Sequence, residues 1–120
     1  FFVDFWKKNK SLQIAKLYKK FGPLPAKAFP GRAAILLKIL NLKKNYIECI
    51  YEKENSNKIG HYAPGTKIPI YSDKNLKKIN KKKPIINLAW HIKNEIKNYL
   101  KRKKIKNKLV NIIDKRDFIA

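Results

Sequence analysis

The chain has 120 residues and a hydrophobic fraction of 44%, which fit one domain with an ordinary packed core. No apolar run approaches the ~18 residues of a membrane-spanning helix and no signal peptide is visible, so we expect a cytoplasmic protein. The net charge of +22 makes nucleic acid the first partner to consider, because clustered lysines neutralise phosphates.

Two features of the charge weaken that interpretation. Only Arg32, Arg102 and Arg116 are arginines, and arginine binds bases and phosphates in a better-defined geometry than lysine does. The lysines also occur with abundant Asn and Ile, a codon bias typical of an AT-rich genome, which enriches surface lysine without a selected partner. A basic nucleic-acid-binding module therefore remains an alternative function.

Residues 1–22 are predicted to form a lead-in amphipathic helix, in one or two pieces, that ends at Gly22-Pro23. Its apolar face has the helical spacing of Ile14, Leu17, Tyr18 and Phe21. An earlier apolar patch, made of Phe2, Phe5 and Trp6, suggests a dimerisation or scaffold domain as a further alternative. Because the chain starts at Phe1 without a methionine, we expect it to be a piece of a longer protein.

Residues 23–120 are predicted to form one α/β domain. A first strand at Leu24–Phe29 leads through Pro30, Gly31 and Arg32 into a helix at Ala33–Leu40. Free N–H groups at such a helix start attract anions, and Arg32 adds a planar donor group. The alternative is that Gly31 only permits a sharp turn and Arg32 is solvated. No glycine-rich cofactor fingerprint is present, so we expect no cofactor in this chain.

A second strand at Tyr46–Tyr51 contains the single Cys49, which is expected to be a buried, reduced thiol. A loop of about fifteen residues follows, and a loop that long in a small domain is often functional. It contains His61 and Tyr62, which can hydrogen-bond and stack, and Pro64-Gly65, which suits a type II turn. The alternative is an ordered structural loop that covers the edge of the sheet.

After this loop, Ile68–Tyr71 is expected to be briefly extended, and Ser72 to cap a short helix at Asp73–Ile79. A third main strand at Pro84–Ala89 ends at Trp90 and His91, which stand at the start of another helix. The last strand is predicted at Leu109–Ile113.

This alternation predicts a three-layer α/β fold with about four mainly parallel strands in the order 2-1-3-4. Ligands of open parallel sheets bind beside the point where the strand order reverses, at the carboxyl ends of the strands. We therefore expect the turn at Gly31 and the Trp90-His91 pair to face one another across one crevice, with the His61–Tyr62 loop as its third wall. No metal-ligand spacing or catalytic triad is present, and the catalytic residues are unknown.

Three runs of residues, FPGRA, YEKENSNKIGHYAPGTKIPIYS and LAWHIKNEI, together resemble the C-terminal domain of bacterial S-adenosylmethionine-dependent C-methyltransferases that modify sugars. The resemblance covers Leu24–Ile113. It implies a Rossmann-like domain that encloses a nucleotide-linked sugar, while a preceding domain, outside this chain, binds S-adenosylmethionine. This chain alone is then not expected to be catalytic, and a small-molecule substrate and a possible homodimer are its expected partners.

The resemblance also implies which residues contact the substrate. The matching positions are Pro30, Gly31, Arg32, Lys58, Gly60, Tyr62, Pro64, Gly65, Thr66, Trp90, His91 and Glu95. With His61 added from the loop, the expected substrate-binding set is Pro30, Gly31, Arg32, His61, Tyr62, Gly65, Thr66, Trp90 and His91. The chain departs from the family at Ala28-Phe29, where Gly-Ala is usual, so the approach of the backbone to a ligand is expected to be tighter or lost. It also lacks the usual run of prolines after Ile113.

Overall fold

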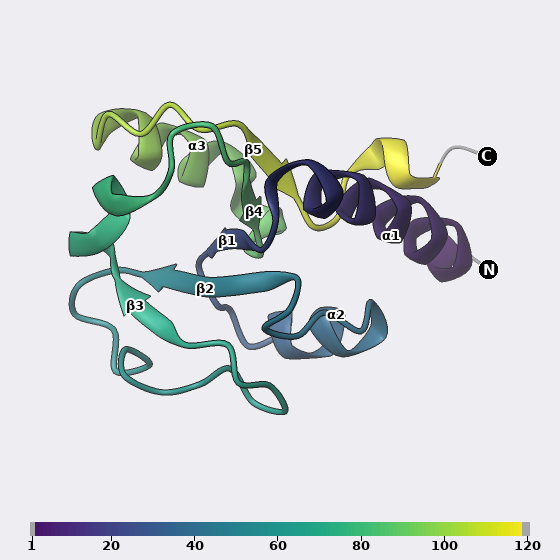
Figure 1. The fold of residues 1–120 in the computed structure, drawn as a ribbon, viewed down its shortest axis with the longest axis horizontal. Helices are drawn as coiled ribbons and strands as arrows, with labels where there is room; N and C mark the ends of the chain where they lie inside the picture. Colours follow the sequence, from purple (N-terminus) through teal and green to yellow (C-terminus); the bar gives the residue numbers. More distant parts are fainter. Residues whose placement is uncertain (1, 119–120) are drawn as a thin grey trace.

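The computed structural model describes residues 2–118, except the side chain of Phe2, so expectations that concern Phe1, the Phe2 side chain or residues 119–120 lie outside it. The chain forms a five-stranded parallel sheet with helices on both faces (Figure 1). Its elements in order, with η for short 3₁₀ helices, are α1 (Phe2–Phe21), β1 (Leu24–Lys27), α2 (Ala33–Ile39), β2 (Ile47–Glu52), β3 (Ile70–Ser72), η1 (Asp73–Lys78), β4 (Ile85–Asn87), η2 (Trp90–Ile92), α3 (Lys93–Arg102), β5 (Leu109–Asn111) and η3 (Lys115–Phe118).

The strand order is β3-β2-β1-β4-β5, with every pairing parallel. The predicted α/β fold is confirmed, and the four predicted strands occupy their predicted order. The segment expected to be only briefly extended becomes β3, a fifth strand at the edge beside β2. Three residues carry too weak a pattern to predict a strand, and the pairing with β2 supplies the hydrogen bonds that define it.

Pro25 is the second residue of β1, the central strand. The register with β2 shifts between Leu24 and Pro25. Proline has no N–H to donate, and an irregularity of the pairing is where a sheet tolerates it.

Two hydrophobic clusters, one on each face of the sheet, define the three layers. The first contains Trp6 and Ile14 of α1 and Ala33 and Leu37 of α2, packed on residues such as Ala26 of β1. The second lies under η1 and α3 and contains buried Cys49, Leu76, Ile79, Ile96 and Leu100. Helices α1 and α2 therefore cover one face and η1 and α3 the other (Figure 1).

Helix α1 is one continuous helix and part of the domain core. Trp6 is 3% exposed, and its indole N–H donates to the Ile112 carbonyl just after β5 at 2.8 Å. The predicted exposed patch of Phe2, Phe5 and Trp6 is therefore wrong for Trp6, because β5 returns to cover it. Phe5 is half-buried. Burial of Trp6 removes the main support for a dimerisation surface at this end of the helix.

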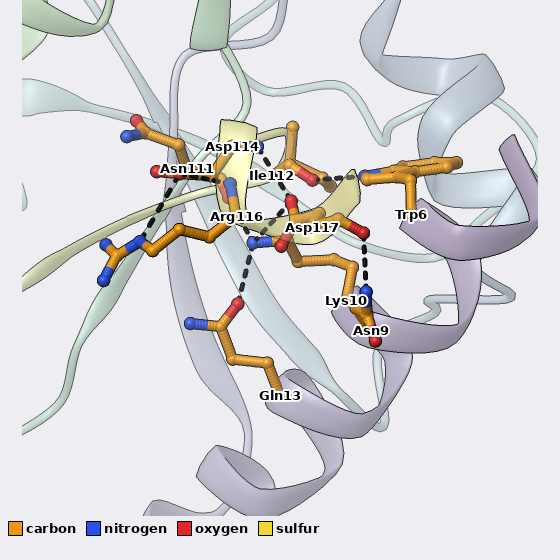
Figure 2. A network of polar contacts seen from close by, with 9 residues as sticks. All are labelled: Trp6, Asn9, Lys10, Gln13, Asn111, Ile112, Asp114, Arg116 and Asp117. Atoms are coloured by element: carbon orange, nitrogen blue, oxygen red, sulfur yellow. Dashed lines mark hydrogen bonds and ion pairs between the residues drawn. The ribbon is translucent and has the colours of Figure 1, made fainter. Parts of the chain in front are cut away.

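A buried ion pair joins α1 to the C-terminal segment (Figure 2). The Lys10 ammonium lies 3.2 Å from the Asp117 carboxylate and donates to the Gln13 side chain and the Asn111 carbonyl, each at 2.7 Å. Burial lowers the pKa of Lys10, against the opposing effect of the Asp117 charge. Removing one partner of a buried pair leaves a charge without compensation, which makes this contact important for the docking of α1.

We expect Lys10→Ala to lower the free energy of unfolding by about 3 kcal/mol, because Asp117 would stay buried without its partner. Lys16→Ala, an exposed lysine on the same helix, should change it by less than about 0.5 kcal/mol. Urea denaturation followed by circular dichroism measures both. Equal losses in the two variants would show that the ion pair does not hold α1.

Ala28, just after β1, has a φ of +68°, in the left-handed region that L side chains disfavour. The chain departs at this position from the family it resembles, in which glycine is usual. A Cβ in this region costs about 1–2 kcal/mol. This turn thus adopts an unusual backbone conformation without glycine, the residue that adopts it most easily.

Ala28→Gly should therefore raise the free energy of unfolding by up to about 1 kcal/mol, since relief of the strained φ outweighs the added flexibility of the unfolded chain. Ala34→Gly, inside α2, should lower it by about 1 kcal/mol. The two thermal unfolding curves give the comparison. If Ala28→Gly unfolded at a lower temperature than Ala34→Gly, the backbone of Ala28 would not be strained.

Candidate functional site

The carboxyl ends of the three central strands meet at one edge of the sheet. Lys27, the last residue of β1, is in register with Tyr51 of β2 on one side and with Asn87 of β4 on the other. Helix α2 leaves β1 toward one face, whereas α3 follows β4 on the other face. The strand order therefore reverses between β1 and β4, as the sequence predicted, and this is where open α/β sheets bind ligands.

The turn at residues 30–32 carries the exposed Gly31 and Arg32. The Ala33 N–H donates to the Pro30 carbonyl at 2.9 Å, so one of the N–H groups expected to hold a phosphate is used inside the turn. A Cβ on Gly31 would meet no atom within 4 Å, and its φ lies outside the left-handed region. The exposed guanidinium of Arg32 is thus the clearest hydrogen-bond donor that this turn offers to an anion.

The long loop after β2 is tied to the same turn. The Lys58 ammonium donates to the Phe29 carbonyl and lies 5.8 Å from the centre of the Phe29 ring. It also forms an ion pair with Glu52 at 3.6 Å. Two of the three expected walls, the turn after β1 and the loop, are therefore in direct contact.

Residues 60–70 of this loop fold into a small hairpin. Gly60 donates to the Ile70 carbonyl at 3.1 Å and Ile70 to the His61 carbonyl at 3.0 Å. Tyr62 is 63% exposed, and His61 is exposed beside it. The loop thus presents an imidazole and a phenol ring from an ordered backbone.

The predicted turn at Pro64-Gly65 is confirmed. The Thr66 N–H donates to the Ala63 carbonyl at 3.0 Å, and Gly65 has a φ of +76°. The Thr66 hydroxyl donates to the Ala63 carbonyl and accepts from the Ile68 N–H. Thr66 therefore already has a structural role in closing this turn.

Four of the nine predicted site residues line two separate depressions, whereas Pro30, Gly31, Arg32, His61 and Tyr62 line neither of them. One of about 650 Å³ lies between α2 and the Pro64–Thr66 turn and is lined by Gly65 and Thr66. Another of about 530 Å³ is lined by Trp90 and His91 together with residues of α3 and the C-terminal segment. Half-buried Trp90 packs on the same cluster as Phe29, which places the two turns on one hydrophobic base. Whether they close on one ligand stays a prediction.

His91 lies in η2, and α3 begins two residues later at Lys93. Because η2 runs directly into α3, His91 stands in the first turn of a continuous helical segment, as predicted. It is exposed, with its ring edge-on to Trp90 at 5.7 Å between ring centres. This exposed position suits a hydrogen bond to a ligand.

A buried polar group at the same edge was missed by sequence reasoning. Lys27 lies 3.0 Å from Asp73 at the start of η1, and the Tyr99 hydroxyl of α3 donates to the same carboxylate oxygen at 2.6 Å. Burial and the Asp73 charge raise the pKa of Tyr99. The other carboxylate oxygen of Asp73 has no hydrogen-bond partner. One sequence signal was available: a lysine at the end of an apolar strand.

The remaining buried titratable groups do not suggest a nucleophile or a metal centre. Cys49 is buried, as predicted, and burial raises its pKa to about 11, so the thiol stays protonated at neutral pH. Burial likewise raises the pKa of Tyr51. Within residues 2–118, no three His, Cys, Asp or Glu side chains gather as metal ligands, and no helix combines the length and hydropathy needed to cross a bilayer.

We expect Lys27→Met to lower the free energy of unfolding by about 3 kcal/mol, because Asp73 would lose its buried counter-ion. Lys53→Met is the matched control: its ammonium lies 5.8 Å from the same Tyr99 ring, but the residue is exposed. The Lys53→Met control should lower the free energy of unfolding by less than about 1 kcal/mol. Chemical denaturation would refute a structural role for the buried pair if Lys27→Met were as stable as Lys53→Met.

Comparison with known proteins agrees with the motifs and with the fold. The family model of the C-methyltransferase C-terminal domain matches residues 8–113. No curated protein matches the chain significantly. The family match includes most of α1, in agreement with the burial of Lys10 and Ile14 in the core. The chain therefore belongs to the family of C-methyltransferase C-terminal domains.

Proposed function

We propose that this domain encloses the substrate of an S-adenosylmethionine-dependent C-methyltransferase, and that the substrate is a nucleotide-linked sugar. The methyl donor would be held by another domain, since the sequence contains no glycine-rich cofactor fingerprint. In this role the chain binds and orients one reactant, and does not carry out the transfer by itself.

The observation that carries this proposal is the reversal of strand order between β1 and β4. It brings the turn after β1 and the Trp90-His91 pair to neighbouring positions on one edge of the sheet. The contact between Lys58 and Phe29 adds the long loop to the same edge. Three segments with exposed polar or aromatic side chains thus start from a rigid base, which favours precise binding of a small molecule.

The side chains suit the parts of a nucleotide-sugar. Arg32 supplies a bidentate donor for a diphosphate, and such contacts are strong because both partners are charged. Tyr62 and Trp90 offer ring faces for a base or a sugar, and His61 and His91 offer hydrogen bonds for hydroxyl groups. Pro30, Gly31 and Gly65 shape the backbone around them.

The proposal is tested by titrating the ¹⁵N-labelled chain with a nucleoside diphosphate sugar and following the amide resonances. We expect saturable shifts in residues 30–34, 60–66 and 88–92. Arg32→Gln should weaken binding about tenfold through loss of a charge-assisted contact. Arg102→Gln removes an equal charge from exposed α3 and should change the affinity less than about twofold.

Titration with the free sugar and with the nucleoside diphosphate separates the two halves of the ligand. Binding of the diphosphate alone, with no gain from the sugar, would limit the site to a phosphate site. Shifts confined to the lysine-rich residues 74–83 and 97–108, or equal losses in the two arginine variants, would remove the proposed site.

A further inference from the structure

The positive charge of the chain is concentrated in one segment. Residues 74–108 contain 14 of the 30 Lys and Arg residues but one of the eight Asp and Glu residues, which gives them +13 of the total +22. A general codon bias toward lysine would enrich it along the whole chain and would not exclude acidic residues from one part. Codon bias therefore does not explain why the positive charge is clustered in this segment.

The fold gathers this segment into one face. The Asn107 side chain, in the connection to β5, donates to the carbonyls of Asn80 at 2.9 Å and Lys83 at 2.7 Å in the connection to β4. Ile85 donates to the Lys108 carbonyl at 2.8 Å. Both connections thus meet at the amino ends of β4 and β5, the edge opposite to the proposed sugar site. Figure 1 shows α3 and the following connection at the upper left, away from α1 and α2.

The basic side chains of this face are open to solvent. Lys83 is half-buried and bonds to the Pro23 carbonyl at 2.7 Å. The other 13 are exposed: Lys74, Lys77, Lys78, Lys81, Lys82, Lys93, Lys97, Lys101, Arg102, Lys103, Lys104, Lys106 and Lys108. Nearly the whole charge of the segment is therefore available to a partner.

The face is also hollowed. Two adjoining depressions of about 660 and 840 Å³ share Lys101, Ile105 and Lys106 in their walls. Lys93, Lys97 and Lys108 line the first, and Lys77, Lys81 and Lys104 line the second. No acidic side chain lines either one, and Leu100 and Leu76 add apolar surface. A concave surface lined by lysines on an apolar floor fits an extended polyanion.

We propose that these two depressions, the basic face, form a docking surface for the phosphate backbone of a nucleic acid, in addition to the substrate site, which the first depression adjoins at Lys93 and Asn94. Lysine provides point charges for phosphates, and Arg102 is the one arginine of the segment, so the surface binds without reading sequence. An anionic membrane fits less well. The exposed large apolar side chains that the structure describes all lie outside residues 74–108: Val3, Leu12, Tyr18, Ile35, Tyr62, Tyr71 and Phe118.

The test compares two fourfold variants that remove the same charge. The face variant carries Lys97→Gln, Lys101→Gln, Lys106→Gln and Lys108→Gln. The control variant changes four exposed lysines of α1 to glutamine: Lys7, Lys8, Lys16 and Lys19. Fluorescence anisotropy with an oligouridylate of about 20 nucleotides gives the affinity at several salt concentrations. Circular dichroism checks that both variants fold.

We expect the face variant to bind at least about tenfold more weakly near 0.1 M salt, whereas the control loses less than about threefold because distant charges are screened. The slope of log K against log salt should become less steep by about 3 for the face variant, since each lost phosphate contact removes about 0.7. A duplex and oligonucleotides of other sequence should compete comparably.

Three results would overturn the proposal. Equal losses in both variants would attribute binding to net charge alone. Competition by poly-glutamate at the same charge concentration would indicate an acidic protein as the partner. Stronger retention on vesicles with anionic lipid than on the oligonucleotide would indicate a membrane surface. Nucleotide-sugar binding by the face variant, measured separately, should stay unchanged.

Discussion

The parallel pairing of β1 with both β2 and β4 is the constraint on which the rest of this structure depends. It makes the four residues of β1 the centre of the sheet, with all four side chains buried. Parallel neighbours must be joined by crossovers, and α2 between β1 and β2 covers one face while α3 between β4 and β5 covers the other. The edge beyond Lys27 is then the place where three turns meet, whatever their own sequences are.

Two buried ion pairs join elements of this arrangement that are far apart in the chain. Lys27 and Asp73 join the end of the central strand to the start of η1, and Lys10 and Asp117 join α1 to the C-terminal segment. Buried pairs of this kind contribute little net stability over apolar residues, but they define which element docks where. In a domain with a net charge of +22, most lysines are exposed, and these two are exceptions at 1% exposure.

The two proposed surfaces differ in the way they are built. The substrate site uses few side chains, each on a turn that is held by backbone hydrogen bonds or by Lys58. The basic face uses many similar side chains, of which no single one is decisive. A small ligand requires precise positions, whereas an extended polyanion responds to the summed field. One small sheet can support both because the connections that carry much of the basic face meet at the amino ends of β4 and β5, whereas the proposed substrate site lies at the carboxyl ends of the strands.

The sequence by itself determined the α/β class, the order of the four main strands, the turn at Pro64-Gly65 and the family, because each rests on local spacing or on a long motif. It also indicated the segments Pro30–Arg32 and Trp90-His91, which follow strands in the chain.

Only the tertiary structure decided the rest. The edge strand β3 exists through its pairing with β2, and Trp6 is buried because β5 returns to it from more than a hundred residues away. The partners of Lys27 and Lys10 lie 46 and 107 residues further along the chain, at Asp73 and Asp117. Local patterns carry no information about such contacts, since the cost of burying a charge is set by whatever the fold brings beside it.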